Sequence, residues 1–484
     1  MTQRLTPDIC VIGAGSGGLT VAAAAAAFGV EVVLIERGKM GGDCLNYGCV
    51  PSKALIAAGK HAEAIRQASD FGVGIGAGEI RVDGQRVHDH VHEVIAAIAP
   101  NDSVERFRGL GVNVIEAEAR FIDHDTVRAG EFEIAARRFV IATGSSPLVP
   151  PIPGLDDVEY LTNETLFDVK QRPAHLLVIG GGPIGMEMAQ AHRRLGSQVT
   201  VVEGQIALGK EDPELTAIVL ERLRVEGIRI IEGAKVTRIA PSARNGEASA
   251  GIELTCEDGD GASFKVDGSH LLVATGRKPN LEALDLPAAG VEFDRAGIKV
   301  GSNLKTSNRR IFAIGDIAGG LQFTHVAGYH AGLVVQQILF RLPASFRPAL
   351  MPRVTFTDPE LAHVGLTEAE ARKEHGDRLE VLRFPYAEND RAQAERRTEG
   401  RIKVIADRRA RILGASIVGA GAGEMINLWT LAVSKKMSLS DIRAYVPPYP
   451  TMTEIGKRAA ITYYAPLTRN RWVRRLLGIL RRFG

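Results

Sequence analysis

Two cysteines stand close together near the start of a chain that uses cysteine sparingly. Cys44 and Cys49 lie in the stretch GGDCLNYGCVPSK, and the 484 residues of the chain include only four cysteines. A close thiol pair in a long chain of this kind indicates redox or metal chemistry, and not the disulfide framework of a small secreted protein. A zinc half-site or a structural disulfide would fit the same spacing, but the sequence has no second cysteine pair to complete a zinc site.

The residues around the pair predict how the two thiols are held. Gly41 and Gly42 predict a turn before Cys44, and the segment Cys49-Val-Pro-Ser-Lys predicts the start of a helix. A thiol at a helix N-terminus has a lowered pKa. The two sulfurs would lie about one helical turn apart, which is close enough for them to form a bridge.

Ahead of the pair, the chain has the pattern of a dinucleotide-binding fold. The stretch DICVIGAGSGGLTVAAAAAAFGVEVVLIE predicts a strand, a glycine turn, a helix and a second strand that ends in an acid. Gly13, Gly15 and Gly18 allow a tight turn, close approach of a pyrophosphate and packing of helix on strand. Glu36 follows Gly18 by 18 residues and is placed to bind ribose hydroxyls. The uncharged stretch from Ile9 to Val30 could span a bilayer by length, but the fingerprint argues against that interpretation.

The same pattern returns in LLVIGGGPIGMEMAQAHRRLGSQVTVVE. It contains Gly180, Gly182 and Gly185, and Glu203 again follows the last glycine by 18 residues. Two such units mean two bound dinucleotides or a duplication with one inactive copy. Because both acids are present, we favour two working sites. An acid at the ribose position prefers a free 2′-hydroxyl, and no basic residue directly follows Glu203, so we expect NADH rather than NADPH.

Two dinucleotide-binding patterns with a thiol pair after the first resemble the class I pyridine nucleotide–disulfide oxidoreductases, the family of dihydrolipoamide dehydrogenase, glutathione reductase and mercuric reductase. The resemblance covers nearly the whole chain. It also rests on the segments IATGSSP, VATGRKPN, IFAIGDIAG, RVTFTDPELAHVGLTEAEA and GAGAGEMI. It implies an α/β fold with two Rossmann-like dinucleotide-binding domains and a C-terminal α+β dimerisation domain. The implied cofactors are FAD and NAD(H).

The resemblance also implies roles for individual residues. Cys49 would lie against the flavin and Cys44 would exchange with substrate. Lys53 would sit near the flavin and pair with Glu187, and Asp316 would contact the ribityl chain. The cofactor-binding positions that the resemblance implies are Gly13, Gly15, Gly18, Glu36, Gly42, Lys53, Thr143, Gly144, Gly180, Gly182, Gly185, Glu203, Gly276, Arg277, Gly315 and Asp316.

The chain departs from the family at two positions that bear on its thiol chemistry. Asp43 stands where relatives usually carry Thr, and its carboxylate should raise the pKa of Cys44. Relatives that reduce disulfides carry His-Pro-Thr near the C-terminus, but the segment VPPYPTMTEIGKRAA has Tyr449 at the His position and keeps Glu454. Tyrosine has a pKa of about 10 against about 6.5 for histidine, so Tyr449 should be a poor base and disulfide exchange should be slow. Another group could substitute, or Tyr449 could be a packing variant.

Tyr449 and the segment PYAENDRA resemble mercuric reductases, which pass a soft metal ion to their thiols. No cysteine follows Cys256, and the first strand begins by Asp8, so we expect neither the C-terminal cysteine pair nor the N-terminal metal-trapping domain of those enzymes. We expect an enzyme that passes electrons between NADH, flavin, the thiol pair and either a soft metal ion or a dithiol or disulfide. Dihydrolipoamide dehydrogenase proper is one alternative. A membrane-associated redox-sensing or adaptor flavoprotein and a thiol-independent diaphorase are others.

These landmarks predict the domain order and the working assembly. If Tyr449 keeps the family geometry, it reaches the thiols of a second subunit, so we expect a homodimer. The predicted segments are an FAD-binding domain at 1–150, an NAD-binding domain at 151–276, a return segment of the FAD domain at 277–349, an interface domain at 350–464 and a basic amphipathic tail at 465–484.

The tail and one histidine cluster stand outside this scheme. LTRNRWVRRLLGILRRFG has six arginines and no acid, and as a helix it would gather its apolar residues on one face. Such a helix is typical of a membrane surface, so we expect peripheral membrane contact through 468–484 on the cytoplasmic face, or packing across the dimer. His88 and His92 share a helix face without a third metal ligand, and we expect a solvated surface and no resident metal. A net charge of +2 gives no reason to expect nucleic acid.

Overall fold

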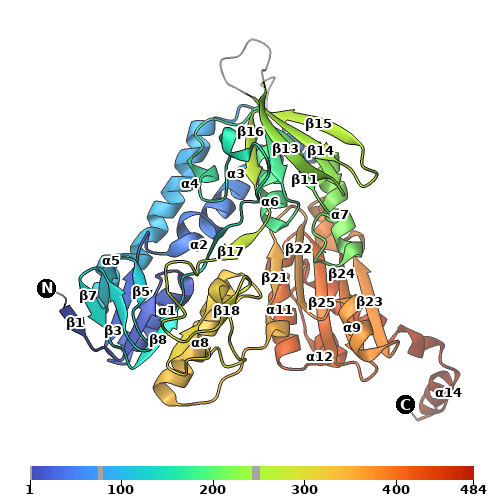
Figure 1. Ribbon diagram of the computed structural model, residues 1–484. Coiled ribbons are helices and arrows are strands. Elements are labelled where there is room, and N and C mark those ends of the chain that lie inside the picture. The colour runs from blue at the N-terminus through green and yellow to red at the C-terminus, as the bar shows by residue number, and fades with distance from the viewer. Residues whose placement is uncertain (1–2, 75–79, 243–250, 484) are drawn as a thin grey trace. The chain divides into compact units, whose positions relative to one another are not determined.

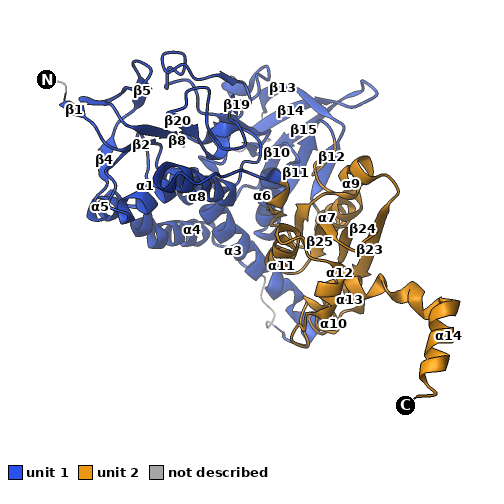
Figure 2. Cartoon of the chain, turned by 90° about the horizontal axis from the view of Figure 1, so that it is seen from below, with its two compact units in different colours: residues 1–205, 228–348 blue, residues 206–227, 349–484 orange. Residues whose placement is uncertain are grey.

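The structure, a computed structural model, describes residues 3–74, 80–242 and 251–483. Figure 2 shows that the chain divides into two compact units. Unit 1 consists of residues 1–205 and 228–348, and unit 2 consists of residues 206–227 and 349–484. The domain bounds expected from the sequence stay a prediction.

Unit 1 contains a parallel sheet built around the first glycine turn (Figure 1). Its central strands are apolar without alternation because both faces are covered. Helix α1 (Ser16–Ala27) connects β2 to β3 and packs against α8 (Thr324–Phe340). The strands in spatial order are β20 (Ile311–Ala313), β8 (Arg138–Ile141), β2 (Ile9–Ile12), β3 (Val32–Glu36) and β4 (Asn113–Glu116).

A second parallel sheet of unit 1 surrounds the second glycine turn. Helix α6 (Pro183–Arg194) connects β10 to β11, as α1 does in the first sheet. The strands in spatial order are β12 (Arg229–Glu232), β11 (Gln198–Glu203), β10 (His175–Ile179) and β16 (His270–Val273). An antiparallel sheet accompanies it, with strands β13 (Lys235–Ser242), β14 (Gly251–Glu257) and β15 (Ser263–Gly268).

Two short strands join these sheets along the chain. Strand β9 (Ser145–Pro147) follows β8, and β17 (Arg277–Pro279) follows β16, and the two pair antiparallel. After β17 the chain returns to the first sheet, where β20 pairs with β8. The remaining named elements of this part of unit 1 are β1 (Gln3–Leu5), β5 (Ala119–Phe121), β6 (Val127–Ala129), β7 (Phe132–Ile134), β18 (Phe293–Asp294), β19 (Gly297–Ile298) and α5 (Val104–Gly109).

Three helices of unit 1 follow the first fingerprint. Helix α2 (Gly42–Asn46) is followed by α3 (Cys49–Gln67), which packs against α6 and against α4 (Gly84–Ile98). The histidine cluster lies on α4, and the rings of His88 and His92 are in contact at a tilt of 42°, with centroids 4.2 Å apart. The expectation of a solvated surface was wrong for His88, whose side chain is only 14% exposed, whereas the side chain of His92 is 40% exposed.

Unit 2 is an antiparallel sheet with helices. Its core includes Trp429 and Tyr386, both almost fully buried. The strands in spatial order are β21 (Arg353–Thr355), β22 (Glu360–Gly365), β25 (Ile412–Gly419), β24 (Arg401–Asp407) and β23 (Leu379–Pro385). The helices are α7 (Pro213–Val225), α9 (Glu368–His375), α10 (Asp390–Ala394), α11 (Ala422–Ser434), α12 (Leu439–Ala444), α13 (Glu454–Thr462) and α14 (Arg471–Leu480).

Helix α7 is fixed to the sheet of unit 2 by a buried ion cluster. Lys403 is 4% exposed, and its Nζ lies 2.7 Å from Asp212 and 2.6 Å from Glu368. Glu214 of α7 lies 3.1 Å from the same ammonium and 2.8 Å from Arg383. Asp212 also caps α7 by accepting from the backbone N–H of Glu214. These ion pairs hold to the sheet a segment that lies between β11 and β12 in sequence and belongs to unit 2.

Candidate redox site

Residues 41–53, which carry both thiols and are called the thiol loop below, pack directly on the first glycine turn. Gly41 and Gly42 have φ values of 85° and 59°, the left-handed turn expected before Cys44. A Cβ on Gly42 would lie 2.8 Å from the Cα of Gly15, so glycine is needed for this close approach. The loop therefore holds its sulfurs beside the segment where a dinucleotide pyrophosphate would bind.

The two thiols differ in their surroundings. Both are free, Cys44 is half-buried, and Cys49 is the first residue of α3. The Sγ of Cys49 lies 3.3 Å from the Thr324 hydroxyl. A hydrogen bond from Cys44, helped by Thr324 and by the charge of Lys53, lowers the pKa of Cys49 to about 6. The same bond and burial raise the pKa of Cys44, so Cys49 is the thiolate of the pair near neutral pH.

The other two cysteines are of a different kind. Cys10 lies on β2 and Cys256 on β14, and both are fully buried. Burial raises the pKa of each thiol. Both are therefore packing residues.

An ion pair links the thiol helix to the second dinucleotide fold. The Nζ of Lys53 on α3 lies 2.8 Å from Oε2 of Glu187 on α6. The Glu187 side chain is 7% exposed and that of Lys53 is 38% exposed. The structure thus brings together the pair expected from the resemblance, and the cation contributes to lowering the pKa of Cys49.

Asp43 takes part in contacts that spacing did not predict. Its Oδ1 accepts a hydrogen bond from Asn163 at 3.0 Å and lies 3.0 Å from Nη2 of Arg277. Asn163 also donates to the backbone carbonyl of Tyr47 within the thiol loop. The charge of Asp43 makes a small contribution to the raised pKa of Cys44, as expected, and partly opposes the lowering of the pKa of Cys49. Asp43 therefore tethers the loop and opposes ionisation of its thiols.

Arg277 extends this network to the expected flavin-binding acid. Its Nε donates to the Ser145 hydroxyl at 2.7 Å, and the Ser145 hydroxyl donates to Asp316 at 2.5 Å. Burial raises the pKa of Asp316. A chain of polar contacts thus runs from the thiol loop through Arg277 to the position expected to meet the ribityl group.

The two glycine turns have the geometry that a dinucleotide needs. A Cβ on Gly18 would lie 1.9 Å from the carbonyl oxygen of Gly13, whereas a Cβ on Gly15 would meet no protein atom within 4 Å. The second turn repeats this, because a Cβ on Gly185 would lie 2.1 Å from the Gly180 carbonyl and one on Gly182 would meet nothing. The open side of the middle glycine is where a pyrophosphate would approach, so both turns fit a dinucleotide.

The two acids also occupy matching positions. Oε2 of Glu36 accepts from the Ala14 N–H at 2.6 Å, and Oε2 of Glu203 accepts from the Gly181 N–H at 2.6 Å. Each carboxylate ends its strand beside its own glycine turn. The second copy is therefore built like the first in each of these details.

The remaining expected cofactor positions lie on the two crossovers and after β20. The side chain of Asn280 donates to the Thr143 carbonyl at 2.9 Å, and the Thr143 hydroxyl donates to the Asn280 carbonyl. Gly144, Gly276 and Gly315 all have positive φ values. The N–H of Gly315 donates to Nδ1 of the buried His330, which orients the turn that carries Asp316.

Tyr449 lies in unit 2 and is 70% exposed. Its hydroxyl donates to Oδ2 of Asp390 at 2.9 Å, and this bond raises the pKa of Tyr449 above its ordinary value. Asn389, next to Asp390, donates to the Thr451 carbonyl at 3.0 Å, so a second hydrogen bond joins the same two segments. Two segments singled out separately, PYAENDRA and VPPYPT, are thus joined. Glu454 is the first residue of α13.

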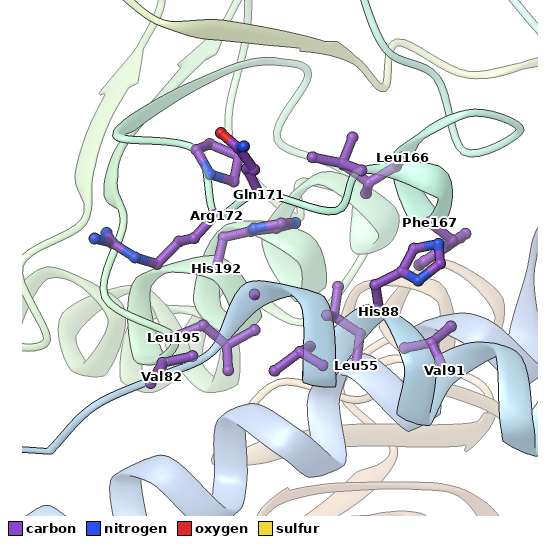
Figure 3. A pocket seen from close by; sticks show the side chains of 14 residues that line it. Leu55, Val82, His88, Val91, Leu166, Phe167, Gln171, Arg172, His192 and Leu195 are labelled. Atoms are coloured by element: carbon purple, nitrogen blue, oxygen red, sulfur yellow. The ribbon is translucent and has the colours of Figure 1, made fainter.

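A small apolar pocket lies in unit 1 between α3, α4 and α6 (Figure 3). Its lining includes Leu55, Val91, Phe167 and His88. The ring of His192 reaches into it, and within the described residues its Nε2 has no hydrogen-bond partner. Burial lowers the pKa of His192 to about 4, so this ring is neutral. The described residues contain no cluster of three metal-ligating side chains, here or elsewhere.

Sequence reasoning missed four residues that contact the predicted site residues, namely Thr324, Asn163, Ser145 and Asp390. Ser145 and Asp390 stand inside segments already recognised by their pattern, so closer attention to IATGSSP and PYAENDRA could have found them. Thr324 is 275 residues from Cys49 and Asn163 is 120 residues from Asp43. No spacing rule connects such distant positions.

Comparison with known proteins identifies two family domains. Residues 7–331 match the family described as pyridine nucleotide-disulphide oxidoreductase. Residues 351–460 match the pyridine nucleotide-disulphide oxidoreductase dimerisation domain.

Individual relatives cover most of the chain. It is 37% identical over 459 residues to a mercuric reductase of Bacillus cereus, covering 94% of this chain and 71% of that protein. It is 35% identical over 462 residues to a dihydrolipoyl dehydrogenase of Staphylococcus aureus, covering 94% and 96%. Among solved structures it is similar to the Cu(II) complex of the HOCl-induced flavoprotein disulfide reductase RclA from Escherichia coli, with a TM-score of 0.81, 29% identity and coverage of 93% and 98%.

Proposed function

Since the chain belongs to the class I pyridine nucleotide–disulfide oxidoreductases, an enzyme family with a dimerisation domain, we propose that it is an FAD- and NADH-dependent reductase whose thiol pair delivers electrons to a soft metal ion. FAD would be held by the turn of Gly13, Gly15 and Gly18, with Glu36 toward its ribose and Asp316 toward its ribityl chain. NADH would be held by the turn of Gly180, Gly182 and Gly185, with Glu203 toward its ribose.

The thiols carry electrons by opening and closing a disulfide between Cys44 and Cys49. Two electrons and two protons convert the disulfide to two thiols, and the low pKa of Cys49 releases one proton near neutral pH. When bound, FAD supplies the transfer of an electron pair between NADH and this site. Lys53 would hold charge beside the thiolate, and Cys44, kept protonated, is positioned to exchange with the acceptor.

The environment of Tyr449 is the observation from which we infer the class of acceptor. A dithiol or disulfide exchanges protons with a base, and a tyrosine whose pKa is raised by Asp390 is a poor base near neutral pH. A soft metal ion displaces the proton of a thiol as it binds, so it needs no side-chain base of this kind. The mercuric reductase relatives and the copper complex of the similar solved structure support the same choice.

Reduction of such an acceptor has a simple balance. NADH gives two electrons, which reduce one Hg(II) to Hg(0) or two Cu(II) to two Cu(I), and NAD⁺ and one proton are released to the solvent. In either case the thiol pair passes through its oxidised form and is reduced again for the next turnover.

The test is a direct competition between acceptor classes. We expect the purified enzyme to oxidise NADH with Hg(II) or Cu(II) in the presence of a small thiol, and Cys44→Ser to lose this activity. With lipoamide as acceptor we expect a rate lower by about 10²–10⁴-fold, the usual contribution of a positioned base. Faster turnover with lipoamide than with either metal would make dihydrolipoamide dehydrogenase the better assignment. Unchanged NADH oxidation in Cys44→Ser would indicate a thiol-independent diaphorase.

The proposal extends to the assembly and its place in the cell. We propose a homodimer in which Tyr449 and Glu454 of one subunit approach the thiols of the other. The enzyme would work in the cytoplasm, where NADH is available and thiols stay reduced. The tail would add peripheral contact with the membrane through residues 468–484. A redox-sensing or adaptor protein of the same fold would instead show little turnover with every acceptor.

A further inference from the structure

Helix α14 separates its arginines completely from its apolar side chains. At 100° per residue, the apolar side chains of α14 fall within an arc of about 160°, and its arginines lie in the remaining arc. Gly478 is the one other residue on the arginine side of the helix. The apolar residues of this face are Trp472, Val473, Leu476, Leu477, Ile479 and Leu480.

The apolar face of α14 is uncovered in unit 2. Trp472 is 75% exposed, and Leu476 and Leu480 are 55% and 53% exposed. Figures 1 and 2 show α14 at the end of the chain, away from the sheet of unit 2. Grouped side chains of this size are seldom left in water on a folded protein, which marks the face as a binding surface.

Charge complementarity identifies what the face binds. The last 18 residues contain six arginines and no acidic residue, so a neutral or basic surface would not attract them. An anionic lipid surface offers phosphates that bind the guanidinium groups, and directly beneath them an apolar layer that can take up the apolar side chains of α14. Trp472 is the side chain that membrane interfaces prefer. Within the described residues, no helix is both long enough and apolar enough to cross a bilayer, so α14 would lie on the surface.

We propose that α14 binds anionic lipid headgroups, lying flat with its apolar arc inserted and its arginines on the phosphates. The matched dimerisation domain ends at residue 460, before this helix begins, so α14 is additional to that domain. The inference specifies the peripheral contact of the proposed function, and it does not depend on which acceptor the thiols reduce.

The test uses the intact holoenzyme with vesicles of defined composition. The chain has two tryptophans, of which Trp429 is buried and Trp472 is exposed. With vesicles of phosphatidylglycerol and phosphatidylcholine we expect co-sedimentation and a blue shift of the Trp472 emission. Trp472→Phe gives the signal of Trp429 alone. With pure phosphatidylcholine, binding should be at least about tenfold weaker.

Two variants separate amphipathic binding from simple attraction of charge. The double variant Arg475→Leu/Leu476→Arg exchanges two neighbouring side chains. It keeps the composition and net charge but places a charge in the apolar arc. We expect this variant to bind anionic vesicles at least about tenfold more weakly. Val225→Asp, at an exposed apolar position on α7, is the control and should bind like the native enzyme.

Three outcomes would overturn the proposal. One is equal binding to neutral and anionic vesicles, and another is native binding by the exchanged variant. The third is no vesicle binding together with a change of oligomeric state on deletion of residues 468–484, which would show that the helix packs against a second copy. NADH oxidation is measured in each variant, so loss of lipid binding with normal turnover leaves the proposed redox function untouched.

Discussion

Cys44 and Cys49 have the same side chain but different acidity, because each contact around them favours one charge state. The hydrogen bond between them, the Thr324 hydroxyl and the Lys53 ammonium all stabilise the Cys49 thiolate. Burial and the shared bond keep Cys44 protonated. A pair with one thiolate and one thiol can hold charge on one sulfur while the other exchanges with an acceptor.

Removing the Thr324 hydroxyl should make Cys49 less acidic. We expect Thr324→Val to raise the pKa of Cys49 above about 6, because one hydrogen bond to its sulfur is lost. The measurement is the pH titration of thiolate ultraviolet absorbance in the reduced protein, with Cys49→Ser to identify the signal. Thr324→Ser keeps the hydroxyl and should titrate like the native protein. An unchanged midpoint in Thr324→Val would mean that the contact has no effect on acidity.

Neutralising Asp43 should have the opposite effect. Its charge raises the pKa of both thiols, so Asp43→Asn should increase the rate at which iodoacetamide alkylates Cys44 at neutral pH by about two- to tenfold. Asp43→Thr also removes the contact with Arg277. Equal effects of the two substitutions would assign the change to charge, and a larger effect of Thr would assign part of it to the tether. A slower reaction in Asp43→Asn would contradict the electrostatic argument.

The glycine turns show that neighbouring glycines in one motif do different work. Gly18 is required by the protein itself, because a Cβ would collide with the Gly13 carbonyl at 1.9 Å. Gly15 leaves open space, because a Cβ there would meet no protein atom within 4 Å. The close packing at Gly18 and Gly185 agrees with the role predicted from the spacing, and the approach of a pyrophosphate to Gly15 and Gly182 stays a prediction.

This difference gives a prediction that separates folding from binding. We expect Gly18→Ala to lower the unfolding free energy of the flavin-free protein by more than about 1 kcal/mol, since backbone must move. Gly15→Ala should leave that stability nearly unchanged and weaken FAD retention. Gly182→Ala and Gly185→Ala should show the same contrast for NADH. Calorimetry without ligand and titration with each dinucleotide measure the two effects. Equal stability loss in Gly15→Ala and Gly18→Ala would contradict it.

Much of the element order could be predicted, because apolar strands, glycine turns and terminal acids follow from local pattern. The start of α3 at Cys49 and the left-handed turn at Gly41 and Gly42 were of this kind. The partial burial of His88 could not be predicted, since histidine occurs both in contact with water and on packed surfaces. Nor could the contacts of Thr324 and Asn163, which the tertiary fold creates between distant segments.

The ion pairs that hold α7 to the sheet of unit 2 were also beyond sequence reasoning, because they join charges that are far apart in sequence. Asp212 and Glu214 come from the α7 segment, whereas Lys403 and Arg383 come from the sheet. In sequence these residues appear as ordinary surface charges, 191 positions apart for Asp212 and Lys403 and 169 for Glu214 and Arg383. The predicted bounds place this segment in the NAD-binding domain, and those bounds stay a prediction.

The cluster predicts how stability depends on pH and on Lys403. The hydrogen bond from Arg383, with others from Lys403 and Arg401, lowers the pKa of Glu214 to about 2 from an ordinary value of 4.5. A group with a lowered native pKa stabilises the fold above its unfolded pKa, so this contribution is lost as pH falls from about 4.5 to about 2.

Lys403→Met should therefore lower the free energy of unfolding by about 3–5 kcal/mol at neutral pH, because it leaves buried carboxylates without their shared cation. Lys265→Met removes an exposed ion pair with Glu253 and should cost less than about 1 kcal/mol. Chemical denaturation at several pH values measures both. A loss in Lys403→Met no larger than that in Lys265→Met would contradict the role of the cluster.

One anaerobic stopped-flow experiment tests most directly whether the thiols serve a metal ion and not a dithiol. The oxidised enzyme is mixed with dihydrolipoamide and flavin reduction is followed, then the mixing is repeated with Tyr449→His. We predict slow reduction of the native enzyme, faster reduction of Tyr449→His because histidine can accept the proton, and normal reduction of both by NADH. Rapid reduction of the native enzyme by dihydrolipoamide would contradict the proposed acceptor and favour a dihydrolipoamide dehydrogenase.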